Sequence, residues 1–332
     1  MTVGRVVRFH EVGGPDVLRV EQGDPGAPGA GEVLVRVAAI GLNRAEASFR
    51  SGRYLEQPRS LPARLGAEAA GTVEAVGAGV TGFAPGAEVS VLPTFSMNDY
   101  GVYADRAVVP VDSLVPLPGG VDMARGAAVW MPYLTAYGAL VDTARVGAGD
   151  VVAITAASSS VGLAAIQLCL HLGAVPVAVT RTAGKAAALR AAGAAEVVVT
   201  EEEETTGALL RHSGGAGVRL VFDPVAGPGV ADLAAATAPG GVVVVYGSLS
   251  GQETPFPRVA VAKGLALRGY TVFELTRDAE RRRRGVRFVN EGLVRGWLRP
   301  TIDRTFALDD IVAAHHYLES NRQVGKIVVE VG

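Results

Sequence analysis

The chain has 332 residues, a formal net charge of −2 and 49% hydrophobic residues, enough for two domains with apolar cores. This charge balance gives no electrostatic basis for binding nucleic acid or an anionic membrane. A single cysteine, Cys169, excludes an intrachain disulfide and a cysteine-based zinc cage, and it favours a reducing compartment. Because no leader-like segment opens the chain and no apolar run reaches about 18 residues, we expect a soluble cytoplasmic protein.

The first 120 residues show the short alternating segments and frequent turns of a β-rich, barrel-like domain. Residues 5–10 and 18–21 predict a hairpin, and residues 32–40 predict a strong strand. Residues 41–52 follow as a short helix that is capped near Asn43. Further short strands are expected within residues 68–91, 102–109 and 114–116.

Residues 151–180 predict a strand–turn–helix–strand unit, reached after a helical segment at residues 122–140. A β-branched run at 151–154 reads as a buried strand, and apolar residues over 161–172 recur with helical spacing. Gly173 ends that helix before a second strand at 175–179. A unit of this kind, about 30 residues long, places a pyrophosphate at the N-terminus of its helix.

The turn of this unit reads Ala-Ser-Ser-Ser-Val-Gly at residues 157–162, where G-x-G-x-x-G is more common. Serine hydroxyls can cap the helix or bind a phosphate, and the backbone N–H groups stay available. Gly162 is expected to permit close contact between helix and strand. The candidate phosphate-binding residues are Ser158, Ser159, Ser160 and Val161.

After residue 180, apolar strands separated by helices predict a parallel, doubly wound sheet. The expected strands are 196–199, 220–223, 242–246 and 267–272. Asp223 ends one of them, and it either touches a cofactor or makes a structural bond in a turn. A charged helical segment follows residue 273, and then a helix at 308–318 and a last strand at 326–331.

The end of the second strand of the unit indicates which dinucleotide binds. A reader of the ribose 2′-hydroxyl would be an Asp or Glu at this point, and Thr180 occupies the place. Arg181 and Lys185 follow, and such a pair can bind a 2′-phosphate. The alternative is that both side chains only solvate the start of a helix. The pattern favours NADPH over NADH.

Several segments together resemble the zinc-independent quinone oxidoreductase branch of the medium-chain dehydrogenase/reductase superfamily. They are FHEVGGPDVLRVE (9–21), GLNRAEASFRSGRY (41–54), LGAEAAGTVEAVGAGV (65–80), LTAYGAL (134–140), AASSSVGLAAIQL (156–168), VFDPVAG (221–227) and NRQVGKIVV (321–329). The resemblance implies an α/β fold with a Rossmann doubly wound parallel sheet and a GroES-like, mostly-β catalytic domain. The expected divisions are residues 1–125 (catalytic), 126–273 (Rossmann) and 274–332 (a return to the catalytic domain).

The same resemblance implies that no metal takes part. Zinc-dependent relatives carry a cysteine about where Asn43 and Arg44 lie and a histidine just before Glu68, whereas this chain has Ala67 there. None of its five histidines has ligand-like spacing with carboxylates, so we expect structural or surface roles for them. Without a Lewis acid, the favoured acceptors are electrophiles that take hydride readily. We therefore expect an enzyme that reduces a quinone or an α,β-unsaturated carbonyl (enone) with NADPH.

Further site residues are implied by the resemblance. Asn43 and Tyr54 are the expected catalytic residues, although Asn43 also fits a helix cap and Tyr54 fits packing. The nicotinamide half of NADPH is expected to meet Thr135, Tyr246, Gly247, Ser248 and Lys326, although Thr135 also fits a buried helix residue.

Two other functions and one assembly state belong to the same interpretation. The first is an enoyl-thioester reductase of a biosynthetic pathway, for which the candidates to bind a carrier phosphate are Arg50, Arg53, Arg59 and Arg64. The second is a non-catalytic NADPH-binding protein. The apolar segment 265–272 comes late in the order of strands, which favours an edge strand that pairs with a second copy in a homodimer.

Overall fold

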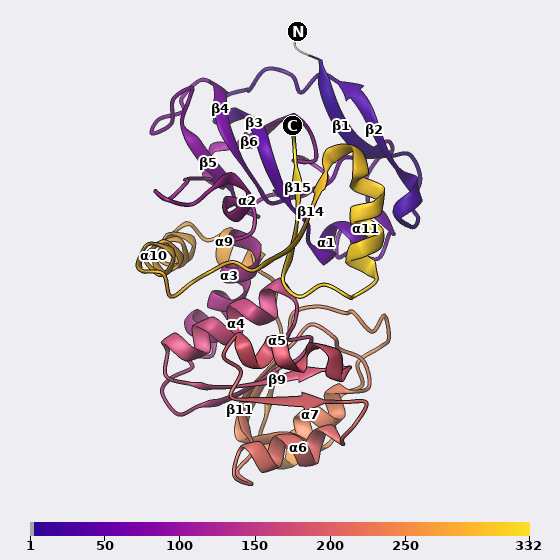
Figure 1. The fold of residues 1–332 in the computed structure, drawn as a ribbon, viewed down its shortest axis with the longest axis vertical. Helices are drawn as coiled ribbons and strands as arrows, with labels where there is room; N and C mark the ends of the chain where they lie inside the picture. The colour runs from indigo at the N-terminus through magenta and orange to yellow at the C-terminus, as the bar shows by residue number, and fades with distance from the viewer. Residues whose placement is uncertain (1–2) are drawn as a thin grey trace. The chain divides into compact units, whose positions relative to one another are not determined.

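The computed structural model describes residues 3–332, and the chain divides into two compact units (Figure 1). The first unit runs to Met131 and resumes with residues 300–332, and the second comprises residues 132–299. The first division lies six residues beyond the expected position at 125, and the return begins at Pro300 instead of at 274. Among residues 3–332, no helix combines the length and the apolar character that crossing a membrane requires.

The first unit is built on a seven-stranded sheet within the described residues, in the order β14-β15-β3-β4-β5-β7, with β6 paired to β3. Its central strand, β3, is paired with β4, β6 and, near its end, with the C-terminal strand β15, which is yellow in Figure 1. The strands are β3 (Glu32–Gly41), β4 (Ala69–Val76), β5 (Glu88–Val91), β6 (Arg106–Pro110), β7 (Leu114–Pro116), β14 (Ile302–Ala307) and β15 (Lys326–Glu330). This pairing brings the last strand of the chain beside one of the first.

A separate antiparallel pair and a few short helices complete the first unit. The predicted hairpin is confirmed as β1 (Gly4–Phe9) paired with β2 (Leu18–Gly23). The predicted helix after β3 is confirmed as α1 (Arg44–Arg50), which begins directly after Asn43. The other helices of this unit are α2 (Met123–Gly126) and α11 (Ile311–Glu319), and α3 (Trp130–Tyr137) carries the chain into the second unit.

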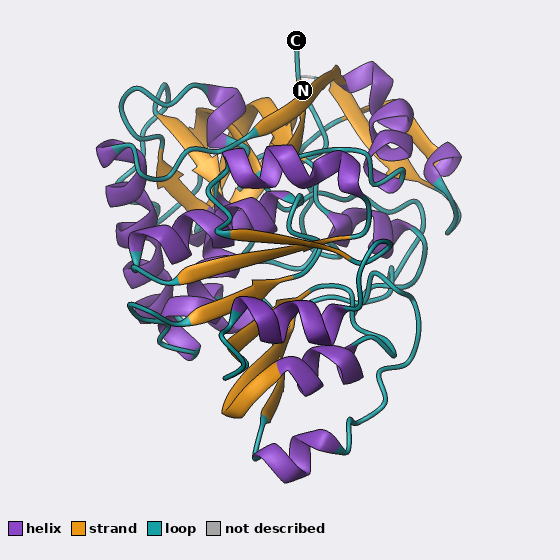
Figure 2. Ribbon diagram, turned by 60° about the horizontal axis from the view of Figure 1, so that its bottom comes forward, coloured by secondary structure: helices purple, strands orange, loops and turns teal. Residues whose placement is uncertain are grey.

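The second unit is a parallel sheet of six strands within the described residues, in the order β10-β9-β8-β11-β12-β13. Counted from β8 this order is 3-2-1-4-5-6, that of dinucleotide-binding sheets. Helices lie on both faces of the sheet (Figure 2), which explains why the strand sequences are nearly continuous apolar runs. The strands are β8 (Val151–Ile154), β9 (Val175–Thr180), β10 (Glu196–Val199), β11 (Val218–Asp223), β12 (Thr237–Val245) and β13 (Ala266–Gly269). The predicted fold class is therefore confirmed.

The helices of the second unit lie between its strands, and the last two follow the final strand of the sheet. They are α4 (Ser160–His171), α5 (Ala186–Ala191), α6 (Thr205–His212), α7 (Val230–Ala236), α8 (Val259–Lys263), α9 (Phe273–Thr276) and α10 (Ala279–Arg295). Strand β13 lies at the edge of the sheet, as the sequence predicts for this segment.

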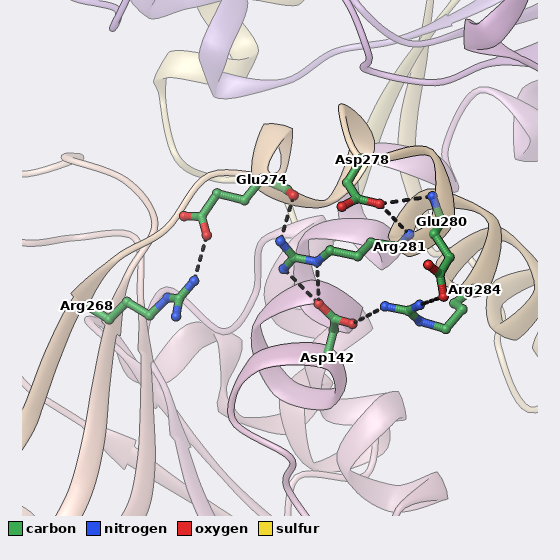
Figure 3. Close-up of polar contacts among 7 residues, drawn as sticks. All are labelled: Asp142, Arg268, Glu274, Asp278, Glu280, Arg281 and Arg284. Carbon is green, nitrogen blue, oxygen red and sulfur yellow. Dashed lines mark hydrogen bonds and ion pairs between the residues drawn. The ribbon is translucent and has the colours of Figure 1, made fainter.

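Ion pairs around Asp142 explain why residues 274–299 stay with the second unit. The guanidinium of Arg281 lies 2.7 Å from the Asp142 carboxylate, and Arg284 reaches the other carboxylate oxygen at 3.4 Å (Figure 3). Asp278 caps α10 by accepting hydrogen bonds from two backbone N–H groups of its first turn. Gly285 brings α10 against Tyr137, because a Cβ there would lie 3.2 Å from that ring. Two arginines of the run at 281–284 therefore help to hold α10.

Candidate functional site

The predicted phosphate turn lies at the carboxyl end of β8, where α4 begins. Ser159 is the N-cap of α4, and its Oγ accepts a hydrogen bond from the Gly162 N–H at 3.0 Å. A Cβ at Gly162 would lie 2.4 Å from the carbonyl oxygen of Ala157, so only glycine lets the helix approach the strand this closely. The expected role of Gly162 is confirmed. The N–H groups of Ser160 and Val161, in the first turn, have no intrahelical acceptor and face the position that suits an anion.

Lys185 is the basic residue that the structure brings to this turn. Its Nζ donates a hydrogen bond to Ser158 Oγ at 2.9 Å, and Ser158 is buried. Thr180, the last residue of β9, is buried as well. The Arg181 side chain is 71% exposed, and its Nε lies 3.8 Å from a Glu201 carboxylate oxygen, a loose surface pair. The two predicted cations therefore differ in position, because the Lys185 ammonium is hydrogen-bonded at the turn and the Arg181 guanidinium lies at the surface.

The carboxyl ends of β8 and β11 are joined where the strand order reverses, the usual ligand position in such sheets. The buried Asp223 carboxylate accepts a hydrogen bond from the Thr155 hydroxyl and another from the Ala226 N–H at 2.8 Å. Ala156 and Ala226 both adopt left-handed conformations, with φ of 45° and 59°. Strained residues of this kind gather at ligand sites. Of the two roles considered for Asp223, these contacts show the structural one.

Three further predicted cofactor residues lie after β12, at the same edge of the sheet. Tyr246 stacks on Phe222 with ring centroids 4.1 Å apart, and its N–H donates to the Asp223 carbonyl oxygen. Gly247 is required where it stands, because a Cβ there would lie 2.7 Å from a carbonyl oxygen of the β11 loop. Gly247 and Ser248 are exposed. Thr135, predicted for the same cofactor, is buried within α3.

The residues at this edge fit a phosphorylated dinucleotide. Available N–H groups at the start of α4 suit a diphosphate, and the Lys185 ammonium beside them adds positive charge. No carboxylate follows β9 directly, since Thr180 is succeeded by Arg181.

In the first unit, Asn43 belongs to a buried polar cluster with Glu68 and Lys326. Lys326 Nζ donates to Asn43 Oδ1 at 2.6 Å and also to the Glu68 carboxylate. Asn43 Nδ2 donates to Glu68 at 3.2 Å, and the Met131 N–H donates to the other Glu68 oxygen at 2.9 Å. Gly41 provides the space, since a Cβ there would lie 1.9 Å from a carbonyl oxygen and 2.7 Å from the Lys326 side chain. Lys326 is only 1% exposed.

Glu46 adds a second buried carboxyl group beside this cluster. It accepts a hydrogen bond from the Asn43 N–H at 2.8 Å, so it completes one half of a capping box. Burial raises the pKa of Glu46 to about 7, although the Lys326 ammonium opposes that rise. The charge of Glu68 also raises the pKa of Glu46, and the charge of Glu46 in turn raises the pKa of the buried Tyr103. Sequence reasoning did not identify Glu46, although its spacing of three residues from Asn43 is the capping-box signal.

The donors around Glu68 do not fit a zinc site. Its carboxylate is bound by an ammonium, an amide and a backbone N–H, and neither a thiolate nor an imidazole is among these partners. Among residues 3–332, no group of three or more His, Cys, Asp or Glu side chains is placed to hold a metal ion.

The remaining candidates have less distinctive surroundings. Tyr54 follows α1, is half-buried, and meets the Phe49 ring edge-on at 6.5 Å. Cys169 is fully buried, and burial raises the pKa of its thiol to about 12, as fits a core residue. Arg50, one of the arginines considered for a carrier phosphate, is fully buried and paired with Glu319, so it does not fit that role.

Comparison with known proteins gives the family. Residues 29–119 match the alcohol dehydrogenase GroES-like domain, and residues 192–329 match the family described as zinc-binding dehydrogenase. Over 331 residues the chain is 34% identical to a quinone oxidoreductase of Lama guanicoe, which covers 98% of the chain and 97% of that protein. It is 29% identical over 335 residues to a 2-haloacrylate reductase of a Burkholderia species, with 97% of each covered.

The solved structures agree with the sequence relatives. The crystal structure of Escherichia coli quinone oxidoreductase complexed with NADPH matches with a TM-score of 0.91 and 27% identity, over 98% of this chain and 99% of that one. These similarities extend over both units of the fold described above. The chain therefore belongs to the quinone oxidoreductases of the medium-chain dehydrogenase/reductase superfamily.

Proposed function

We propose that this protein transfers hydride from NADPH to a quinone or an α,β-unsaturated carbonyl compound. The observation that carries the proposal is the Lys185 ammonium on Ser158, at the start of α4 and at the carboxyl end of β8. Two relatives support the substrate classes, one named a quinone oxidoreductase and the other a 2-haloacrylate reductase, whose substrate is a conjugated acid. The NADPH complex of the Escherichia coli protein supports the choice of cofactor.

In this proposal the second unit binds the cofactor. The diphosphate lies on the N–H groups and hydroxyls of the turn, and Thr180, Arg181 and Lys185 surround the 2′-phosphate. The nicotinamide half meets Thr135 and the loop that follows β12. The residues assigned to the cofactor are thus Thr135, Ser158, Ser159, Ser160, Val161, Thr180, Arg181, Lys185, Tyr246, Gly247 and Ser248.

The first unit contributes the residues that act on the acceptor. NADPH supplies a hydride when it is bound. We assign to the Tyr54 hydroxyl a hydrogen bond to the oxygen that gains negative charge, and to Asn43 the orientation of the reacting groups. Lys326, predicted from the sequence to meet the nicotinamide half, is assigned instead a positioning role through Asn43, because its ammonium is buried and donates to the Asn43 amide oxygen. The proton that completes the reduction of a quinone comes from solvent.

The proposal is tested by steady-state oxidation of NADPH and of NADH against quinones, enals and enoyl thioesters. We expect turnover with quinones or enones. The kcat/KM for NADPH should be at least about tenfold above that for NADH, because one charge-assisted hydrogen bond to the 2′-phosphate contributes that factor. Faster turnover of crotonyl thioesters than of any quinone would identify an enoyl-thioester reductase. NADPH binding without turnover of the whole panel would identify a non-catalytic protein.

Replacing Lys185 by alanine tests the assignment of the 2′-phosphate. We expect the KM for NADPH to rise about 10- to 100-fold, because a charge-assisted hydrogen bond contributes roughly 1.5–3 kcal/mol, while the KM for NADH stays nearly unchanged. Arg181→Ala should have a smaller effect in the same direction, since that side chain is mostly exposed. Arg190→Ala, which removes a cation of the following helix α5, is the matched control. Equal effects of Lys185→Ala on both coenzymes would contradict the assignment.

We also propose a homodimer that forms through the edge strand β13. Among residues 3–332 this strand is paired only with β12, so its other edge offers backbone groups to a second copy. Light scattering at micromolar concentration should give twice the mass of the 34.1 kDa chain. A mass of one chain at that concentration would count against the dimer.

Glu46→Gln tests the buried carboxyl group beside Asn43. The folded-state pKa of Glu46 is about 7 against 4.5 for the free group, so its contribution to stability is complete below pH 4.5 and is lost as pH rises to 7. Glutamine stays neutral. The free energy of unfolding of the variant relative to the parent should therefore increase between pH 4.5 and 7, by at most about 1.4 kcal/mol per pH unit, and level off above.

Urea denaturation of both proteins at a series of pH values measures this difference in unfolding free energy. The contributions of the other titrating groups are the same in both proteins and cancel in the difference. Glu291→Gln, at a largely exposed position on α10, is the surface control. A difference that stays constant from pH 4.5 to 7 would show that burial does not raise the pKa of Glu46.

A further inference from the structure

Three buried side chains of the first unit carry polar atoms that lack a partner. Arg50 Nε and Nη1, Tyr103 Oη and both ring nitrogens of His315 have no hydrogen-bond partner among residues 3–332. Each of the three side chains is at most 1% exposed. Buried polar groups are nearly always hydrogen-bonded to protein or to water. Five orphaned atoms on three neighbouring side chains therefore require an explanation.

The three side chains converge between α1 and α11. Arg50 ends α1, and its Nη2 is paired with Glu319 of α11. His315 lies four residues before Glu319, on the same face of that helix. The Tyr103 ring meets the His315 ring edge-on, with centroids 5.8 Å apart. The Arg50 charge also acts on the pKa values of both Tyr103 and His315, as expected of direct neighbours.

Hydrogen-bond donors outnumber acceptors in this group. Arg50 Nε carries one N–H and Nη1 carries two, while neutral His315 and Tyr103 add one donor each. Against these five donors stand one ring nitrogen of His315 and the Tyr103 oxygen. Bonds among the three side chains cannot satisfy all the donors in any arrangement. The group needs an acceptor from outside its own side chains.

The charges nearby show what kind of acceptor fits. The Arg50 charge is balanced by Glu319, and burial followed by the Arg50 charge lowers the pKa of His315 to about 3, so its imidazole is neutral. Arg44, the other guanidinium that acts on His315, donates to the Leu318 carbonyl oxygen at the C-terminal end of α11, where a cation is stabilised. Each of the two guanidiniums therefore already has an oxygen acceptor on or next to α11. The ligand that fits is uncharged and small, and it accepts hydrogen bonds from two of the three donors that remain.

We propose that Arg50, Tyr103 and His315 enclose an internal water site, and that its water joins α1 to α11. A water molecule accepts two hydrogen bonds and donates two, and internal waters make about three bonds to groups of this kind. Such a water replaces the direct contacts that the three side chains do not make. The site is independent of the proposed reaction, and its tests use density and stability instead of turnover.

Tyr103→Phe distinguishes a hydrated site from a dry one by the sign of its effect. In a hydrated site the substitution removes a partner of the water, and the midpoint of thermal unfolding should fall by about 2 °C or more. In a dry site it removes an unsatisfied hydroxyl, so the midpoint should stay the same or rise. Tyr270→Phe is the matched control. The Tyr270 hydroxyl also lacks a partner among residues 3–332, but it packs where a Cβ on Gly138 would lie 2.1 Å away.

The expected result is a lower midpoint for Tyr103→Phe and an unchanged or higher one for Tyr270→Phe. A crystal structure of the parent protein at better than about 1.5 Å resolution, grown with bromide, is the second measurement. Electron density for water within hydrogen-bond distance of at least two of the three side chains would support the proposal. An anomalous bromide peak there would overturn it in favour of an anion site, and an absence of density would overturn it in favour of a dry cluster.

Discussion

The buried ion pair between Lys326 and Glu68 is the interaction on which the arrangement of the first unit depends. It joins β15, the last strand of the chain, to the segment before β4, and the Asn43 amide links both to the start of α1. Removing one partner of such a pair would leave an uncompensated buried charge, at a cost of about 3–5 kcal/mol. The pair tolerates no side chain at Gly41, so the sequence of β3 is constrained by a contact made with the far end of the chain.

In the second unit, the buried carboxylate of Asp223 has a comparable role, but it holds backbone segments in place. Asp223 fixes the two loops that follow β8 and β11, and it does so through one hydroxyl and backbone N–H groups. With these loops fixed, Ala156 and Ala226 can keep left-handed conformations that alanine avoids elsewhere. The result is a rigid edge of the sheet beside the start of α4. Because this edge is already ordered, binding of a ligand there would cost little conformational entropy of the protein.

The sequence alone predicts what local patterns encode. The strands at 151–154 and 175–179 follow from β-branched apolar runs, and the roles of Ser159 and Gly162 follow from the chemistry of a helix start. Buried charges are not predictable in this way, because Arg50, Glu46 and Lys326 look like ordinary surface residues until their partners are known. The partners of Lys326 lie 258 and 283 residues away. The return to the first unit was expected at residue 274 and lies at Pro300 for the same reason. Asp142, which pairs with Arg281 of this charged segment, lies far away in sequence.

The identity of the cation in the first unit bears on the proposed chemistry. An ammonium donates hydrogen bonds but has no vacant orbital with which to polarise an alkoxide, as zinc does in alcohol oxidation. The Lys326 ammonium donates to Asn43 and Glu68, which are both protein groups, so its positive charge holds the buried cluster together. In the proposed reaction, the hydride acceptor would therefore stabilise most of its new negative charge itself. Quinones and conjugated carbonyl compounds do so, because the charge spreads over a ring or an enolate, which is why the proposed function and the buried lysine fit together.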